Sequence, residues 1–186
     1  MQLSNIEFVK PELRLTSEVL VVGSSRSLLH HYGGQIDSFE TVIRFNRAPT
    51  VGFEEHVGTK TELRILNNHV FENVRLGKEF TNQPQKFVNR FNKRGNRVYL
   101  FDYQQITKLK NITEFESEAN MSVGAVTVAL LINSGIKVKI IGFDLNQMKT
   151  SHYWEERPEQ MSSAHDQSYE KYWLKNLLLN KKIKTL

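Results

Sequence analysis

Short runs rich in Val, Ile and Leu recur along this chain and alternate with longer stretches whose apolar residues repeat with helical spacing. Such runs are typical of buried strands, and the longer stretches are typical of helices with one face on a core. We expect strands near residues 19–23, 41–45, 63–66, 97–102 and 138–142. We expect helices near residues 26–32, 83–93, 122–134 and 167–180. This alternation predicts an α/β fold with a mainly parallel sheet and helices on both faces.

A sheet of this type also predicts where a ligand binds, because open α/β sheets hold ligands beyond the carboxyl ends of their strands. Gly23, Asn46 and Phe143 each follow an expected strand, so we expect all three at one edge of the sheet. The polar stretch after Phe143 carries His152 and is expected to form a long loop. Loops of this type often close over a substrate.

The turn Gly23-Ser24-Ser25 offers backbone N–H groups and hydroxyls to a phosphate at a helix N-terminus. Leu28 replaces the third glycine of a dinucleotide-binding turn, and residues 58–61 lack the Gly-Lys pair of a P-loop. Ser27 stands where the Gly-x-Ser-x-Gly motif of serine hydrolases ends in glycine. The sequence therefore indicates a phosphate-binding turn of another kind.

The composition is that of an ordinary globular protein, with 186 residues of which 39% are hydrophobic and 24% are charged. We expect a single domain over residues 1–186, large enough to form its own core. The sequence shows no apolar run long enough for a membrane span and no signal-peptide pattern. Its zero cysteines fit a reducing compartment, so we expect a soluble cytoplasmic protein.

The distribution of charge and of metal-ligating residues argues against nucleic-acid and metal partners. The net charge is +5, but only residues 181–184 form a basic run, which we interpret as a solvated surface. No signature of a nucleic-acid-binding module is present, so we expect no nucleic-acid partner. We expect no metal, because the sequence has no cysteine, no Asp-x-Asp pair and no histidine cluster with a clear carboxylate partner. His30 and His31 are interpreted as surface residues on the first helix.

Four motifs in a fixed order carry the strongest functional signal. The first comprises the Gly23 turn, Gly34-Gln35-Ile36-Asp37, residues 42–50, Gly52-Phe53-Glu54 and residues 57–61. The second joins Met121-Ser122-Val123-Gly124 to Ile140-Ile141-Gly142-Phe143, the third is His152-Tyr153-Trp154-Glu155, and the fourth is His165 with Glu170. Together these residues resemble the sialylmotifs of the eukaryotic-type sialyltransferases, glycosyltransferase family 29.

The resemblance implies a Rossmann-like domain, a GT-A-like variant, that moves sialic acid from CMP-sialic acid to an acceptor sugar hydroxyl with inversion. It implies that His165 is the general base and that His152 donates to the departing phosphate. It assigns these residues to the substrate site: Gly23, Ser24, Ser25, Asn46, Ser122, Val123, Gly124, Gly142, Phe143 and Tyr153. Glu170 is expected to orient the start of its helix.

The implied partners are a CMP-sugar donor and a glycan acceptor, with no cofactor. CMP leaves with one phosphate, whose developing charge can be met by backbone N–H groups, hydroxyls and a histidine without a metal. Histidine suits the role of base because its reference pKa lies near 6.5.

Each role has a structural alternative. A histidine at the position of His165 is often a helix cap or a surface residue, and His152 can simply pack in an aromatic loop. Ser122 fits the N-cap of the following helix, a role that can coexist with anion binding. Asn46 can start the turn before Pro49.

Two departures from the family pattern keep other functions open. Ser24 stands where the family usually has Asn, and residues 121–124 lack the usual Pro and Thr, so donor affinity or identity can differ. One alternative is transfer of Kdo, a related sugar acid that is also carried on CMP. The other is a minimal protein that binds CMP or hydrolyses a CMP-sugar.

Overall fold

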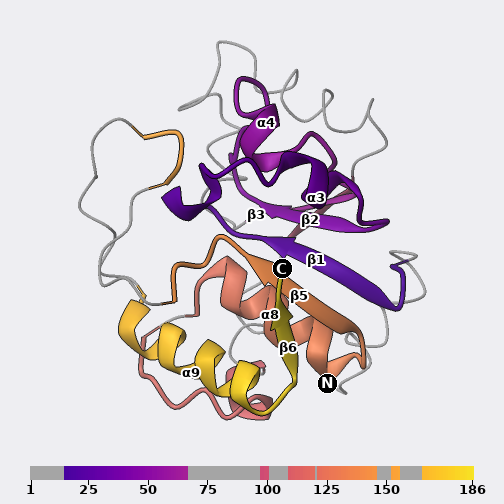
Figure 1. The fold of residues 1–186 in the computed structure, drawn as a ribbon. Helices are drawn as coiled ribbons and strands as arrows, with labels where there is room; N and C mark the ends of the chain where they lie inside the picture. The colour runs from indigo at the N-terminus through magenta and orange to yellow at the C-terminus, as the bar shows by residue number, and fades with distance from the viewer. Residues whose placement is uncertain (1–14, 67–96, 101–108, 120, 146–151, 156–164) are drawn as a thin grey trace.

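A computed structural model describes residues 15–66, 97–100, 109–119, 121–145, 152–155 and 165–186 (Figure 1). Its strands form one six-stranded sheet in the order β4-β3-β2-β1-β5-β6, and every pair in it is parallel. The strands are β1 Glu18–Val22, β2 Val42–Phe45, β3 Leu63–Leu66, β4 Arg97–Leu100, β5 Lys137–Ile141 and β6 Ile183–Thr185.

The five strands expected from the apolar runs are therefore confirmed, each within a residue or two of its expected position. The sixth strand, β6, was not predicted, because Ile183 is its one apolar residue and lysines flank it. Ile183 is buried in the core and β6 pairs with β5 at the sheet edge. Part of the basic run at 181–184 is thus an edge strand.

Two of the expected helices are present as α8, Val123–Asn133, and α9, Gln167–Leu179. The helix expected at 26–32 is wrong: a 3-10 helix, η1 Arg26–Leu28, and a turn occupy this stretch. Only Leu28 of η1 is fully buried, so no repeated apolar face supports a longer helix. Two short helices were missed, α3 Gly33–Asp37 and α4 Glu54–Val57. The helix expected at 83–93 lies outside the described residues.

Helices cover both faces of the sheet, as expected, with α8 and α9 on one face and α3 and α4 on the other (Figure 1). Successive strand residues point to opposite faces. Val19 and Val21 of β1 therefore join the core beneath α8, whereas Leu20 and Val22 join the smaller core beneath α3.

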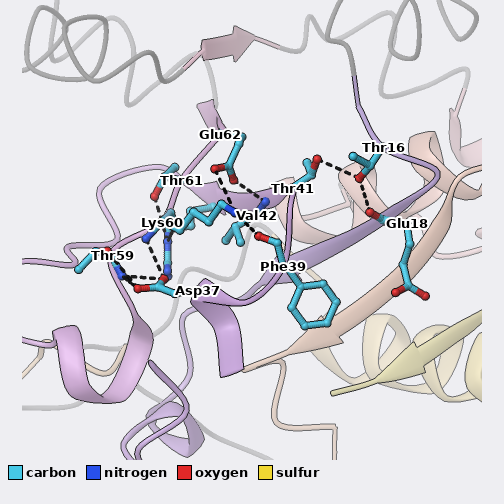
Figure 2. A network of polar contacts seen from close by, with 11 residues as sticks. Thr16, Glu18, Asp37, Phe39, Thr41, Val42, Thr59, Lys60, Thr61 and Glu62 are labelled. Carbon is cyan, nitrogen blue, oxygen red and sulfur yellow. Dashed lines mark hydrogen bonds and ion pairs between the residues drawn. The ribbon is translucent and has the colours of Figure 1, made fainter. Parts of the chain in front are cut away.

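A polar network on the α3 and α4 side ties the segments that lead into β2 and β3 (Figure 2). The Asp37 carboxylate accepts from the backbone N–H groups of Thr59 and Lys60, each at 2.9 Å. A Cβ on Gly58 would lie 2.3 Å from Asp37 Oδ1, so only glycine leaves room for this contact. Glu62 accepts from Val42 N–H at 2.7 Å. These residues hold the amino ends of β2 and β3, opposite to the edge where a ligand is expected.

Candidate functional site

The carboxyl ends of β1 and β5 touch through two glycines. Gly23 N–H donates to Ile141 O at 2.7 Å, and Ser25 N–H donates to Gly142 O at 3.1 Å. A Cβ on Gly23 would lie 2.1 Å from the Gly142 carbonyl oxygen, a distance that no side chain tolerates. The Gly23 turn is therefore fixed against the end of β5, where the sequence places Gly142.

Phe143 extends this contact to α8 and β2. A Cβ on Gly124, in the first turn of α8, would lie 2.9 Å from Phe143 Cε1. The rings of Phe143 and Phe45 meet edge to face with centroids 6.3 Å apart. The structure thus brings together the predicted residues Gly23, Gly124, Gly142 and Phe143 at one edge. The neighbouring Val123 packs partly against the core beneath α8.

Ser122 is the N-cap of α8, as its structural alternative predicted. Its side-chain oxygen accepts from Ala125 N–H at 3.2 Å, and its own backbone N–H donates to the Glu170 carboxylate. The cap does not remove the anion-binding character of the end, because the positive pole of an eleven-residue helix remains there.

Glu170 joins the starts of α8 and α9. It is 9% exposed, and burial raises the pKa of its carboxyl group, while hydrogen bonds from Ser122 and the nearby His165 act in the opposite direction. Sequence analysis expected Glu170 to orient its own helix, and the structure adds this link to α8. Ser122, Glu170 and His165 therefore form one group.

His165 is not the cap of α9. Asp166 occupies the N-cap position and accepts from Tyr169 N–H at 2.9 Å, so one structural alternative for His165 is wrong. His165 itself is half-buried directly before the helix and lies within electrostatic range of Glu170.

The turn that carries His152 lies against the Gly23 turn. His152 forms an antiparallel bridge with Ser25, and Tyr153 N–H donates to Ser24 O at 3.0 Å. The His152 ring stacks on Trp154, with centroids 4.5 Å apart, and its Nδ1 lies 2.6 Å from Glu155 Oε1. Since Nδ1 is engaged by Glu155, Nε2 is the ring nitrogen that can reach a ligand.

Tyr153 supports the site from behind. It is 3% exposed, and burial raises the pKa of its phenol to about 12. The hydroxyl donates to Pro49 O, and the ring packs edge to face on Phe53. Tyr153 therefore fixes the turn that follows Asn46, and its role in shaping the donor site stays a prediction.

Asn46 sits in a turn that Arg64 holds, a contact that sequence analysis missed. Asn46 has a φ of 41°, and its N–H donates to Ile65 O at 2.8 Å. The Arg64 guanidinium donates to the carbonyls of Asn46 at 2.9 Å, Ala48 at 3.0 Å and Phe45 at 3.3 Å. An arginine in an expected buried strand was the signal that could have revealed this role, because a buried guanidinium needs acceptors.

Burial lowers the pKa values of two arginines, Arg44 on β2 and Arg64 on β3. Arg64 is 2% exposed, and burial with the nearby Arg44 lowers its pKa to about 10. Arg44 is its register partner on β2 and donates from Nε to Lys60 O and Thr61 Oγ1, both at 3.0 Å. Burial lowers the pKa of Arg44 as well. Both side chains bond to the backbone of loops.

The sequence is similar to a known protein family and to curated members of it. The sequence profile of glycosyltransferase family 29 (sialyltransferase) matches residues 10–94 and 72–182. A beta-galactoside alpha-2,6-sialyltransferase 2 from Danio rerio is 50% identical over 54 residues, which cover 28% of this chain and 10% of that relative. A mouse alpha-N-acetyl-neuraminyl-2,3-beta-galactosyl-1,3-N-acetyl-galactosaminide alpha-2,6-sialyltransferase is 45% identical over 67 residues, which cover 35% of this chain and 19% of the relative.

The fold also matches a solved structure. The crystal structure of a mammalian sialyltransferase in complex with Gal-beta-1-3GalNAc-ortho-nitrophenol superposes with a TM-score of 0.65 at 23% identity, covering 98% of this chain and 77% of that one. This likeness confirms the Rossmann-like architecture. Within the part of the chain that the structure describes, no helix combines the length and apolar character needed to cross a membrane.

Proposed function

Because the chain belongs to glycosyltransferase family 29, the sialyltransferases, we propose that it transfers sialic acid from CMP-sialic acid to a hydroxyl of an acceptor sugar. The stretches that align with the curated relatives span a fifth or less of those proteins, so the activity is inferred from the site. The observation that carries the proposal is the Glu170 carboxylate, which joins the α8 N-terminus to the segment bearing His165.

The donor would bind at the carboxyl edge of the sheet. The phosphate lies between the Gly23 turn and the N-terminus of α8, where backbone N–H groups and the helix dipole favour negative charge. Asn46, in the turn held by Arg64, lies beside the cytidine. Ser24 and Ser25 add hydroxyls, and the His152 turn packed on them brings Nε2 of His152 toward the phosphate.

His165 would act as the general base. Its imidazole takes the proton from the acceptor hydroxyl, while that oxygen forms a bond to the anomeric carbon of the sialic acid. The bond from this carbon to the phosphate oxygen breaks, and its electron pair leaves with CMP. His152 donates a hydrogen bond to the departing phosphate. One displacement of this kind inverts the anomeric configuration.

Transfer without a metal is part of the proposal, for a chemical reason. The leaving group carries a single phosphate, and the donors at the Gly23 turn, the α8 N-terminus and His152 suffice to meet its charge. A cytoplasmic location stays a prediction from the absence of cysteine.

Release of CMP by the purified chain tests the function. CMP-sialic acid and CMP-Kdo are supplied in parallel, with and without Gal-beta-1-3GalNAc-nitrophenol and with excess EDTA throughout. We expect release from CMP-sialic acid that depends on the acceptor and persists in EDTA. Preference for CMP-Kdo would correct the donor, release that ignores the acceptor would favour a hydrolase, and CMP binding without release would contradict an enzyme.

A further inference from the structure

His31, Glu55 and His56 come together on the surface beside α3 and α4, outside the residues assigned to transfer. His31 Nδ1 lies 2.9 Å from Glu55 Oε1, and the rings of His31 and His56 have centroids 4.6 Å apart. One potential ligand atom from each residue lies within 4.8 Å of the other two. Among the described residues, this is the group of histidines and carboxylates that meets these distances.

The backbone fixes the two segments that carry these side chains. A Cβ on Gly33 would lie 2.2 Å from Glu54 O and 2.7 Å from Glu55 O, so the chain after His31 touches the backbone of α4 directly. His31 has a φ of 63°, an uncommon conformation for histidine. Its backbone N–H donates to His56 Nδ1 at 3.3 Å. The side chains therefore start from a shared, preset position.

The geometry points to a binding site for a zinc-type divalent cation, with His31 Nδ1, Glu55 Oε1 and His56 Nδ1 as ligands. Two imidazoles and one carboxylate form a donor set that zinc accepts, with a fourth position left to water. Nδ1 of His56 has one lone pair, which now accepts the hydrogen bond from His31 N–H, so this long bond must give way when the nitrogen binds the cation. For His31 Nδ1 to bind the cation, the proton that it shares with Glu55 must leave this nitrogen, and in a neutral imidazole it moves to Nε2, which faces solvent.

Only small movements separate the present arrangement from a coordinated one. Tetrahedral zinc at about 2.0–2.2 Å from each ligand sets its ligands about 3.3–3.5 Å apart. The pair His31 and Glu55 must open slightly from 2.9 Å, while His56 must move inward. The side chains of His31 and Glu55 are 62% and 75% exposed, so they rotate without disturbing the core.

The site is independent of the proposed transfer reaction. None of its three residues belongs to the donor or acceptor assignments, and α4 places them on the side of the sheet opposite to α8 and α9. The sequence expectation of no metal rested in part on the lack of a carboxylate partner for the histidines. In the folded chain the segment of His31 meets α4, about 25 residues later, and Glu55 of α4 becomes the carboxylate partner of His31.

Calorimetric titration of the untagged chain with Zn²⁺ at near-neutral pH tests the inference. We expect one zinc per chain, because the group offers a single set of three ligands. His31→Asn and His56→Ala should each weaken binding by at least about tenfold. Asparagine is used at position 31 because it tolerates positive φ.

His30→Ala is the matched control, since His30 is an exposed neighbour that is not part of the group. It should bind zinc as the parent chain does, and circular dichroism verifies that every variant is folded. Absence of zinc binding would overturn the inference. So would a zinc affinity that survives both substitutions but is lost in His152→Ala or His165→Ala. No donor sugar is present in this titration, so its outcome does not depend on the transferase proposal.

Discussion

The two faces of the sheet are built in different ways. Toward α8 and α9 the strands present apolar side chains throughout, and these are Val19, Val21, Ile43, Phe45, Leu63 and Ile65. Toward α3 and α4 the same strands present Leu20, Val22 and Val42, but also the buried guanidinium groups of Arg44 and Arg64. Burying a charged group costs free energy unless its hydrogen bonds are made. The hydrogen bonds of the two guanidinium groups must therefore offset the cost of removing them from water.

This difference indicates that the two faces have different roles. Arg64 bonds to the turn that carries Asn46, and Arg44 bonds to the loop before β3, so the arginine face fixes backbone. The apolar face carries α8 and α9, and residues of the proposed site lie at or directly before the starts of these helices, namely Ser122, His165 and Glu170. We therefore propose that the arginine face mainly positions the substrate site and that the other face brings His165 to it, while the His152 turn reaches the site from the arginine face through Tyr153.

Removal of the proposed base gives the largest expected effect. His165→Ala should lower the turnover number by about 10²–10⁴-fold, the usual contribution of general acid–base catalysis, and leave CMP affinity nearly unchanged. Transfer kinetics with a saturating donor and a CMP titration measure the two quantities. His30→Ala is the control for loss of a histidine. If His165→Ala retains turnover, the chemistry does not belong to the α8 and α9 side.

Arg64→Lys separates positioning from chemistry. A lysine cannot reach three carbonyls of one turn, and hydrogen bonds from charged groups are worth about 1.5–3 kcal/mol each, so stability should fall by about 3 kcal/mol. CMP binding should weaken about tenfold, equivalent to about 1.4 kcal/mol, because the Asn46 turn loosens.

Arg44→Lys is the matched variant, because Arg44 is equally buried but holds a different loop. Chemical denaturation should show a similar loss of stability for both variants, while CMP affinity should fall only for Arg64→Lys. Double substitution with Asn46→Ala should add little to the loss of CMP affinity. Equal loss of CMP affinity in both arginine variants would mean that the face acts through stability alone.

Gly23→Ala tests the contact between the ends of β1 and β5. The new methyl group would meet the Gly142 carbonyl oxygen, and overpacking of this kind costs about 1–3 kcal/mol. Gly34→Ala is the control, since its added Cβ meets nothing within 4 Å and it lies within α3. It should be neutral or slightly stabilising. Thermal unfolding that ranks the two variants in the reverse order would disprove the close approach.

Glu170→Gln gives the smallest and most diagnostic effect. Burial raises the folded-state pKa of Glu170 above its ordinary value of 4.5. Its contribution to stability is therefore complete below pH 4.5 and is lost as the pH rises through the folded-state pKa. Glutamine keeps an oxygen for Ser122 N–H but does not ionise. The variant should thus gain melting temperature relative to the parent as the pH rises from 4.5 toward neutrality, and a gap that moves the other way would contradict the shift.

Sequence patterns predicted the parts of the fold that depend on local hydrophobicity. The central strands and α8 are continuous apolar runs, so their positions follow from burial alone. The short helices α3 and α4 were invisible, because Gly33-Gly34 disfavours a helix and α4 has only four residues. Edge strand β6 depends on pairing with β5, which no local pattern reveals.

The candidate site shows the same limit. The expected strand ends predicted that Gly23 and Phe143 lie at the carboxyl edge, and the structure brings them together there with Gly142 and Gly124. The role of Arg64 and the burial of Tyr153 behind Pro49 depend on contacts across 16 and 104 residues of chain. Such contacts require the folded arrangement of the strands.

The position of bound CMP tests the central claim most directly. A crystal structure of the chain with CMP should show the phosphate between the Gly23 turn and the N-terminus of α8, with the nucleoside beside Asn46 and Nε2 of His152 directed at the phosphate. CMP bound on the side of α3 and α4, or with its phosphate away from the α8 N-terminus, would contradict the division between a positioning face and a chemical face.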